Sequence, residues 1–268
     1  MPVIIFGLTA IGLYLSAGVL LARRLFLRQD LQNAGPVAIL TLSAVSLAFH
    51  AVVIAQAIFT AEGLNLGFFH AASLVTGAMA LLLLGAALLY PVENLGIVVF
   101  PIAAIGLAFD LIVPPHHIVV ERRTIGLDLH IIFSILAYSI LALAATQALF
   151  LAIQEYHLRH KRPGGFMRLF PPLETMERLL FHMLGLGLFL LTLALIKGVI
   201  FLEDIFTQHL VQKTVLSIIA WIVFAILLWG RYQFGWRGRV AIRGTLIGFA
   251  VLLLAYFGSK FIGELILG

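Results

Sequence analysis

The chain has 268 residues, of which 62% are hydrophobic and only 11% are charged, and its mean hydropathy of +1.12 lies far above that of a soluble domain. The formal net charge of +5 does not indicate nucleic-acid binding, because the basic residues flank apolar runs. Cysteine is absent, which excludes a disulfide framework, a CxxC redox pair and covalent attachment of a c-type haem to this chain.

Apolar runs long enough to cross a bilayer predict about eight membrane-spanning helices. The expected fold class is therefore all-α, a polytopic transmembrane helical bundle. The runs cover residues 3–22, 37–59, 66–90, 95–113, 129–153, 178–202, 214–230 and 243–266. The first run is not interpreted as a secretory signal peptide, because Arg23 and Arg24 follow it instead of preceding it.

Lysine and arginine in the loops predict the orientation of the helices. Three basic loops alternate along the chain as loops on one side of a membrane would, and this side is assigned to the cytoplasm. They are residues 23–36, 154–178 and 231–243. The opposite loops hold only Arg122, Arg123 and Lys213. Both termini are therefore expected on the outer (periplasmic) side of a bacterial inner (cytoplasmic) membrane, with the lipid bilayer as the surroundings of a multi-pass protein.

The chain is expected to form one transmembrane domain over residues 1–268. A basic cytoplasmic loop at 154–177, rich in proline and glycine, separates a five-helix part (1–153) from a three-helix part (178–268). Glycines at positions 185, 187, 244 and 248 are expected to provide small faces for close helix contact.

The segment 128–138 (DLHIIFSILAY) combines high hydrophobicity with an aspartate and a histidine at its start. His130, Ser134 and Tyr138 are spaced i, i+4 and i+8, so they form one polar stripe on a helix. Because polar groups in lipid are costly unless they face protein or a cavity, this stripe is expected to point inward. Asp128 is expected to be the N-cap of this helix.

Ionisable residues within the predicted spans concentrate in the outer half of the membrane. Because ionisable groups are costly inside a membrane, such residues are functional candidates. They are His50, His70, Asp110, His130, Lys197, Lys260 and Glu264. Neutral imidazole can bind haem iron or another transition metal, and lysines can pair with haem propionates. His50 is flanked by apolar residues on both sides. His70 lies at a helix end, so it can also be interpreted as a residue at the membrane–water interface. His209 lies in an outer loop, so it can also be interpreted as a solvated residue without a ligand.

Three stretches carry a resemblance to a known family. They are the segment 128–138, the helix 213–231 (KTVLSIIAWIVFAILLWGR) with 235–239 (GWRGR), and 255–258 (AYFG). Together they resemble the cytochrome c assembly (CcsA/CcmC-type) membrane proteins, and the chain is most similar to the short YpjD-like inner-membrane branch. The resemblance implies non-covalent binding of b-type haem (heme) on the outer side of the membrane. It implies that His130 is a haem ligand, that Lys213 is the lysine of the tryptophan-rich motif, and that His50 corresponds to the buried helix histidine.

The chain also departs from the family pattern. The tryptophan-rich region is here 207–214 (TQHLVQKT), without tryptophan, Trp229 stands where the family has its second helix histidine, and the closing outer histidine is missing. Half of each expected ligand pair is therefore absent. His209 or His70 is left as the partner of His130, and we expect haem binding more than haem delivery.

The sequence therefore favours a haem-binding membrane protein of the cytochrome c assembly type, with no enzymatic activity and with other cytochrome c assembly proteins as partners. The cofactor-binding candidates are His130, His50, His70, His209, Lys213 and Lys197, and the metal-ligand candidates are His130 and His50. One alternative is an accessory role in divalent-cation (magnesium or cobalt) homeostasis beside a cation-efflux protein, using Asp110 and Glu264. A second is a structural membrane subunit without a ligand.

Overall fold

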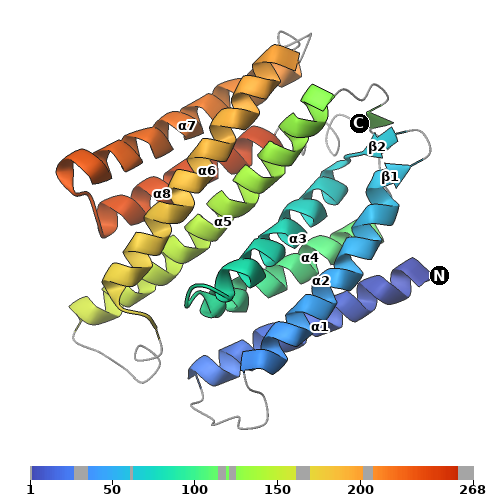
Figure 1. The fold of residues 1–268 in the computed structure, drawn as a ribbon, viewed down its shortest axis with the longest axis horizontal. Coiled ribbons are helices and arrows are strands. Elements are labelled where there is room, and N and C mark those ends of the chain that lie inside the picture. Colours follow the sequence, from blue (N-terminus) through green and yellow to red (C-terminus); the bar gives the residue numbers. More distant parts are fainter. Residues whose placement is uncertain are drawn as a thin grey trace. The chain divides into compact units, whose positions relative to one another are not determined.

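A computed structural model of the chain describes residues 2–26, 36–60, 63–113, 119–120, 125–160, 170–201 and 208–258. Eight of the described helices are long and apolar enough to cross a membrane, which confirms the predicted all-α multi-pass fold (Figure 1). In chain order they are α1 (Pro2–Phe26), α2 (Pro36–Ile58), α3 (Phe68–Ala87), α4 (Gly96–Ile112), α5 (Ile125–Arg159), α6 (Leu173–Phe201), α7 (Gln208–Phe234) and α8 (Arg239–Leu253). A short 3₁₀ helix (Glu93–Leu95) precedes α4, and a π-helical turn (Leu254–Gly258) extends α8. The fourth and eighth spans include these turns, as Glu93–Ile112 and Arg239–Gly258.

Helix α5 is longer than the apolar run that predicts it. Its 35 residues span roughly 52 Å, well beyond the ~30 Å hydrocarbon core of a bilayer. The last turns are polar but still helical, because the Glu155 carboxylate and the Arg159 guanidinium form an i,i+4 ion pair at 2.7 Å. At the other end α5 begins at Ile125, so Asp128 lies in the first helical turn and not at the N-cap.

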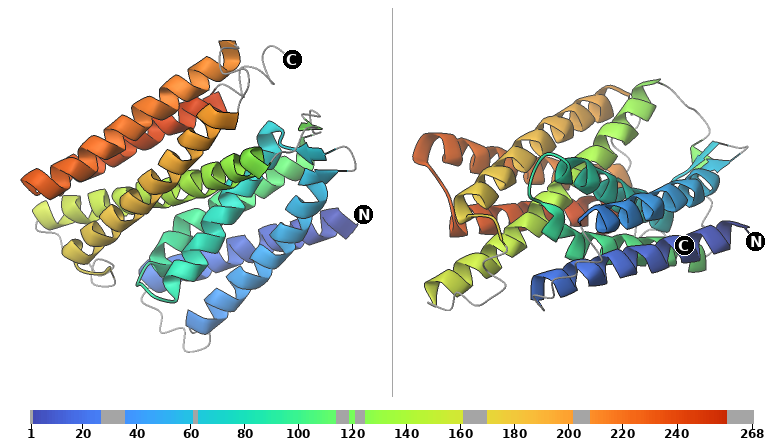
Figure 2. Two further views of the ribbon diagram at one scale, coloured as in Figure 1. Left: turned by 45° about the horizontal axis from the view of Figure 1, so that its top comes forward. Right: turned by 60° about the horizontal axis from the view of Figure 1, so that its bottom comes forward.

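The chain forms two compact units, and the first contains α1 to α4. Helix α1 packs against α2 and α4, and α3 packs against α2 and α4 (Figure 2). The apolar centre of this unit includes Ala10, Val53 and Leu107, which are fully or almost fully buried. Helices α1, α2 and α4 therefore share one apolar core.

A small antiparallel sheet closes one end of the first unit. It has the order β1 (Phe59–Thr60), β2 (Gly63–Asn65) and β3 (Val119–Val120). Phe59 pairs with Leu64, and Leu64 pairs with Val120. Because β1 follows α2, β2 precedes α3 and β3 follows α4, the sheet places these three helix ends together. Gly63 has φ 142°, a backbone conformation that a side chain would disfavour.

The second unit contains α5 to α8 and the π-helical turn. Helix α5 packs along α6 and also against α8, while α7 packs against α6 and α8. The domain boundaries predicted above stay a prediction. Contacts within the structure nevertheless group α5 with the three helices that follow it, so they divide the helices four and four instead of five and three.

Within each unit, a polar contact joins two helix ends that the predicted topology places on the same side of the membrane. In the first unit, the Arg24 guanidinium at the end of α1 lies 3.6 Å from the Glu93 carboxylate, just before α4. In the second, the Glu177 carboxylate near the start of α6 accepts a 2.7 Å hydrogen bond from the Gly238 N–H before α8. These contacts agree with the predicted alternation of the loops. The assignment of this side to the cytoplasm, and of the termini to the outer side, stays a prediction.

Three of the four glycines expected at close helix contacts do face a neighbouring helix. A Cβ on Gly248 would lie 2.7 Å from Phe224, one on Gly244 would lie 3.0 Å from Leu227, and one on Gly187 would lie 2.6 Å from Leu141. A Cβ on Gly185 would meet nothing within 4 Å. Two residues along a helix turn the side chain through about 200°, so Gly185 and Gly187 point in opposite directions.

Replacing Gly248 by alanine is expected to lower the free energy of unfolding by about 1–3 kcal/mol, because the new methyl group would overlap the Phe224 ring. Thermal unfolding of the purified chain, followed by circular dichroism, measures the change. Gly185→Ala is the matched control. It adds the same methyl group in open space and is expected to be neutral or to stabilise by about 0.5–1 kcal/mol through helix propensity. Equal effects of the two substitutions would contradict the packing argument.

Candidate functional site

The first polar centre is His50, which is fully buried in the middle of the four-helix unit. Its Nδ1 lies 3.3 Å from the Tyr14 hydroxyl of α1, and its Nε2 lies 3.0 Å from the Ser73 hydroxyl of α3. Tyr14 and Ser73 are themselves fully buried. One ring therefore connects three helices, and both of its nitrogens have a hydroxyl partner.

The space around the His50 ring is closed by a glycine. A Cβ on Gly77 would lie 3.1 Å from the His50 Cε1 atom, so α3 approaches the ring as closely as packing allows. Ser73 and Gly77 are four residues apart and thus share one face of α3. The contacts around His50 favour a structural role for this histidine, and its predicted role as a ligand would require one nitrogen to leave its hydroxyl.

The second polar centre is a hydrogen-bonded pair between His70 of α3 and Asp110 of α4. The Asp110 Oδ1 atom contacts His70 Nδ1, and the two residues are only 7% and 8% exposed. Phe69 and Phe109, their sequence neighbours, stack with ring centroids 5.8 Å apart. An ionisable residue inside a membrane is costly unless it is paired, and this buried hydrogen-bonded pair reduces the cost for both residues.

The position of His70 at a helix end also fits a residue at the membrane–water interface. The structure instead shows His70 buried and paired with Asp110. Its Nδ1–H donates to the carboxylate, and among the described residues its Nε2 has no hydrogen-bond partner. Metal-binding histidines commonly have this arrangement, in which a carboxylate fixes the ring and leaves the other nitrogen for the metal. His70 also precedes Ser73 by three residues, so the two polar centres lie within one turn of α3.

The third polar centre is His130, in the second unit. Its Nδ1 lies 2.8 Å from the carbonyl oxygen of Ala194 on α6. A carbonyl oxygen can only accept, so Nδ1 carries the proton, and in the neutral ring Nε2 holds a lone pair. No described residue forms a hydrogen bond with that nitrogen. His130 is partly exposed, so the residue as a whole does not lie in the closed core.

Tyr138 of the predicted polar stripe on α5 also makes contacts between helices. The Tyr138 hydroxyl donates a 2.6 Å hydrogen bond to the Leu252 carbonyl of α8. The Tyr138 ring contacts Tyr256 of the π-helical turn, with centroids 5.8 Å apart. The stripe therefore connects α5 to α6 at His130 and to α8 at Tyr138, which is the inward direction that membrane energetics predicts.

The two candidate lysines also belong to the second unit. Lys197 follows Ala194, the residue whose carbonyl holds His130, by three positions on α6, so both occupy one face of that helix. The Lys213 ammonium group of α7 lies 6.0 Å from the centroid of the Tyr256 ring, within the range of a cation–π contact. The backbone of His209 lies in the first turn of α7, but its side chain is outside the described residues.

The structure therefore sorts the predicted site residues by unit. His50 and His70 lie in the first unit, and His130, Lys197 and Lys213 lie in the second. The described residues contain no group of three or more histidines and carboxylates arranged around a metal ion. Taken one at a time, His70 and His130 each fit a haem ligand by their chemistry, since each has Nδ1 engaged and, among the described residues, no hydrogen-bond partner at Nε2.

Sequence reasoning missed the partners of these histidines. Composition and helical spacing do not indicate Tyr14 or Ser73, and they place Asp110 among the ionisable residues of the outer half without indicating His70 as its partner. A signal for the His70–Asp110 pair was present. His70 begins one helix and Asp110 ends the next, so in an antiparallel pair they lie at equal depth, and a carboxylate inside a membrane needs a partner.

These features define a multi-pass α-helical membrane protein whose buried polar groups are organised around histidines on several helices. The chain belongs to the cytochrome c assembly protein family, whose model matches residues 39–267. This result confirms the resemblance on which the sequence interpretation depends.

Curated relatives agree with this assignment. The chain is 40% identical over 169 residues to the inner membrane protein YpjD of Escherichia coli K12, a match that covers 63% of this chain and 64% of YpjD. It is 37% identical over 146 residues to an uncharacterised 28.8 kDa protein of Azospirillum brasilense, with 54% of each chain covered. The cytochrome c biogenesis protein CcsA of Mesostigma viride is 30% identical over 93 residues, or 34% of this chain and 30% of CcsA.

No solved structure matches the chain. The matched segments cover less than two thirds of the length of YpjD and of the other two curated relatives. The name of YpjD and the eight spans confirm the expected localisation, an inner membrane crossed several times.

Proposed function

We propose that the chain holds haem non-covalently through histidine near the outer face of the membrane, as a cargo-binding component of cytochrome c assembly without bond-making chemistry of its own. Family membership supports a role in cytochrome c biogenesis. The observation that carries the haem-binding step is the state of His130, whose Nδ1–H is held by the Ala194 carbonyl while Nε2 keeps its lone pair.

In this proposal the residues of the chain supply a ligand, its orientation and a charged surrounding. The His130 Nε2 atom would hold the iron, and the Ala194 carbonyl of α6 fixes the ring by accepting a hydrogen bond from Nδ1–H. Lys197, one turn further along α6, and Lys213 of α7 supply positive charge for the haem propionates. When bound, haem would supply an iron centre that accepts an imidazole nitrogen.

His70 is the second ligand candidate, for the same physical reason. Its Nδ1 is held by the buried Asp110 carboxylate, which fixes the orientation of the ring. His50 is the weaker candidate, because both of its ring nitrogens already have hydroxyl partners. Because the chain contains no cysteine, haem held here would not be attached through thioether bonds to this chain.

Alanine at His130 is expected to reduce haem retention at least about tenfold, since even the loss of a group that only orients a ligand costs roughly 10–100-fold in metal affinity. The measurement is the Soret absorbance and the pyridine haemochrome spectrum of detergent-purified protein from a haem-supplemented host. His182→Ala is the matched control, because this histidine is exposed on α6. His130→Gly with added imidazole is expected to regain the absorbance.

The proposal fails if the wild-type protein from that host has no Soret band. The assignment of His130 fails if His130→Ala and His182→Ala keep equal haem. His70→Ala is measured in the same way, so each candidate ligand is decided by itself. Engagement of the Asp110 carboxylate by His70 makes this residue a poor oxygen ligand for a divalent cation.

A further inference from the structure

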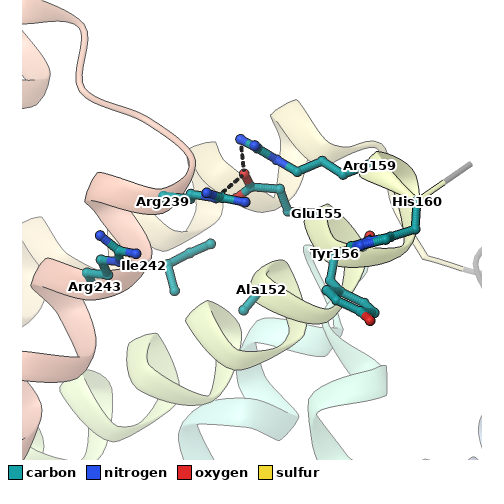
Figure 3. A pocket seen from close by; sticks show the side chains of 8 residues that line it. All are labelled: Ala152, Glu155, Tyr156, Arg159, His160, Arg239, Ile242 and Arg243. Atoms are coloured by element: carbon teal, nitrogen blue, oxygen red, sulfur yellow. Dashed lines mark hydrogen bonds and ion pairs between the residues drawn. The ribbon is translucent and has the colours of Figure 1, made fainter.

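A basic surface pocket lies in the second unit, away from the histidines discussed above. It has a volume of about 220 Å³ and is formed by the end of α5 and the start of α8. Three arginines line it, Arg159 from α5 and Arg239 and Arg243 from α8 (Figure 3). The only acidic residue in the lining is Glu155, so the charged side chains of the pocket carry a positive excess.

Glu155 organises this charge without cancelling it. Its Oε1 atom lies 2.7 Å from the Arg159 guanidinium and 3.5 Å from that of Arg239, so one carboxylate holds two arginines from different helices side by side (Figure 3). Each guanidinium has five N–H donors, and most of them remain for another acceptor. Among the described residues Arg243, one turn beyond Arg239 on α8, has no ion-pair partner.

The pocket also has an apolar side and a position at the membrane boundary. Ala152 and Ile242 line it together with the arginines. Helix α5 becomes polar from Gln154 onward, so the arginines lie where the apolar span ends. The basic loops predict that this boundary is the cytoplasmic one, where anionic phospholipids create a negative surface. A ligand with a phosphate head and an apolar body fits this combination of walls.

We propose that this pocket binds the phosphodiester headgroup of an anionic phospholipid, with Arg239 and Arg243 as its principal contacts. Arginine pairs well with phosphate because its planar guanidinium donates two parallel hydrogen bonds, and basic pockets between transmembrane helices on the cytoplasmic side bind such headgroups. The first N–H groups of α8 add positive potential at the same place. A bound lipid joins α5 to α8 at the end where Glu155 is their polar link.

The test is native mass spectrometry of the full chain in a neutral detergent, with phosphatidylglycerol, phosphatidylcholine of the same acyl chains, or inorganic phosphate added. We expect phosphatidylglycerol to bind and the other two not to bind. The double variant R239Q/R243Q is expected to weaken that binding at least about tenfold, a factor typical of losing one charge-assisted contact. Unfolding temperature with each additive gives a second readout, because a ligand stabilises the state that binds it.

The matched control is R178Q/R237Q, which removes two exposed arginines of the same unit that do not line the pocket. It lowers the net charge equally and is expected to bind phosphatidylglycerol as the wild type does. R239K/R243K keeps the charge and is expected to retain part of the binding, so a folding defect and a lost contact are distinguished. Equal loss in the control, or equal binding of phosphatidylcholine, would overturn the site. Arginine-dependent binding of inorganic phosphate alone would overturn the lipid assignment.

Discussion

Replacing Asp110 by alanine is expected to lower the free energy of unfolding by about 3–5 kcal/mol, the usual cost of removing one partner of a buried ionic pair. The reason is that His70, only 7% exposed, would keep a ring N–H in an apolar surrounding with no acceptor. The loss should appear as a lower detergent-denaturation midpoint, measured by circular dichroism. Tryptophan fluorescence would not report it directly, since the three tryptophans, Trp221, Trp229 and Trp236, all belong to the second unit.

Two controls separate pairing from packing. Glu93→Ala breaks the exposed Arg24–Glu93 contact of the same unit, whose side chains are 43% and 39% exposed, and such pairs contribute only about 0–1 kcal/mol. The double variant H70L/D110L replaces both partners by apolar groups and is expected to recover most of the stability lost in Asp110→Ala. The pair does not stabilise this unit if Asp110→Ala lowers the free energy of unfolding no more than Glu93→Ala does. The same conclusion follows if H70L/D110L lowers it more than Asp110→Ala does.

The same variants bear on the haem proposal. If His70 is a ligand, Asp110→Asn is expected to keep the fold better than alanine does, because an amide oxygen can still accept from Nδ1–H, but to weaken haem retention through the loss of the negative charge. If His70 only packs, Asp110→Asn changes stability and leaves the haem spectrum of the folded protein as it was.

The sequence was enough to predict the helices but not their partners. Eight long apolar runs determine eight spans because a backbone in lipid must satisfy its own hydrogen bonds. The axial register and rotation of neighbouring helices depend on side-chain packing, which hydropathy does not report. Gly185 and Gly187 illustrate this limit, since both are small and only Gly187 meets a neighbouring helix.

The candidate site divides in the same way. That His130 and Tyr138 turn inward follows from the cost of polar groups in lipid. That Nδ1 of His130 is bound by a backbone carbonyl does not follow, because every residue of α6 carries such a carbonyl and none leaves a mark in the sequence. The sequence does not predict the basic pocket for a related reason. Arg159 and Arg239 are 80 positions apart in the chain, and each alone predicts only a cytoplasmic helix end.

Replacing His50 by leucine is expected to destabilise the first unit by about 2–4 kcal/mol and to leave the haem spectrum of the folded protein unchanged. Leucine fills much of the ring volume, but it leaves the Tyr14 and Ser73 hydroxyls buried without their imidazole partner, and each such group costs about 1–3 kcal/mol. Circular dichroism in increasing denaturing detergent gives the stability, and the Soret absorbance per folded molecule gives the haem content.

The partners of His50 allow this prediction to be checked as a network. Tyr14→Phe removes one hydroxyl and keeps the ring, so about 1 kcal/mol is expected. Because Tyr14 and His50 are in direct contact, the double variant Y14F/H50L is expected to cost less than the sum of the two single variants. Additive costs would show that the contact contributes nothing. A folded His50→Leu protein with altered haem absorbance would instead make His50 a ligand, and its two hydroxyl partners would then be groups that position it.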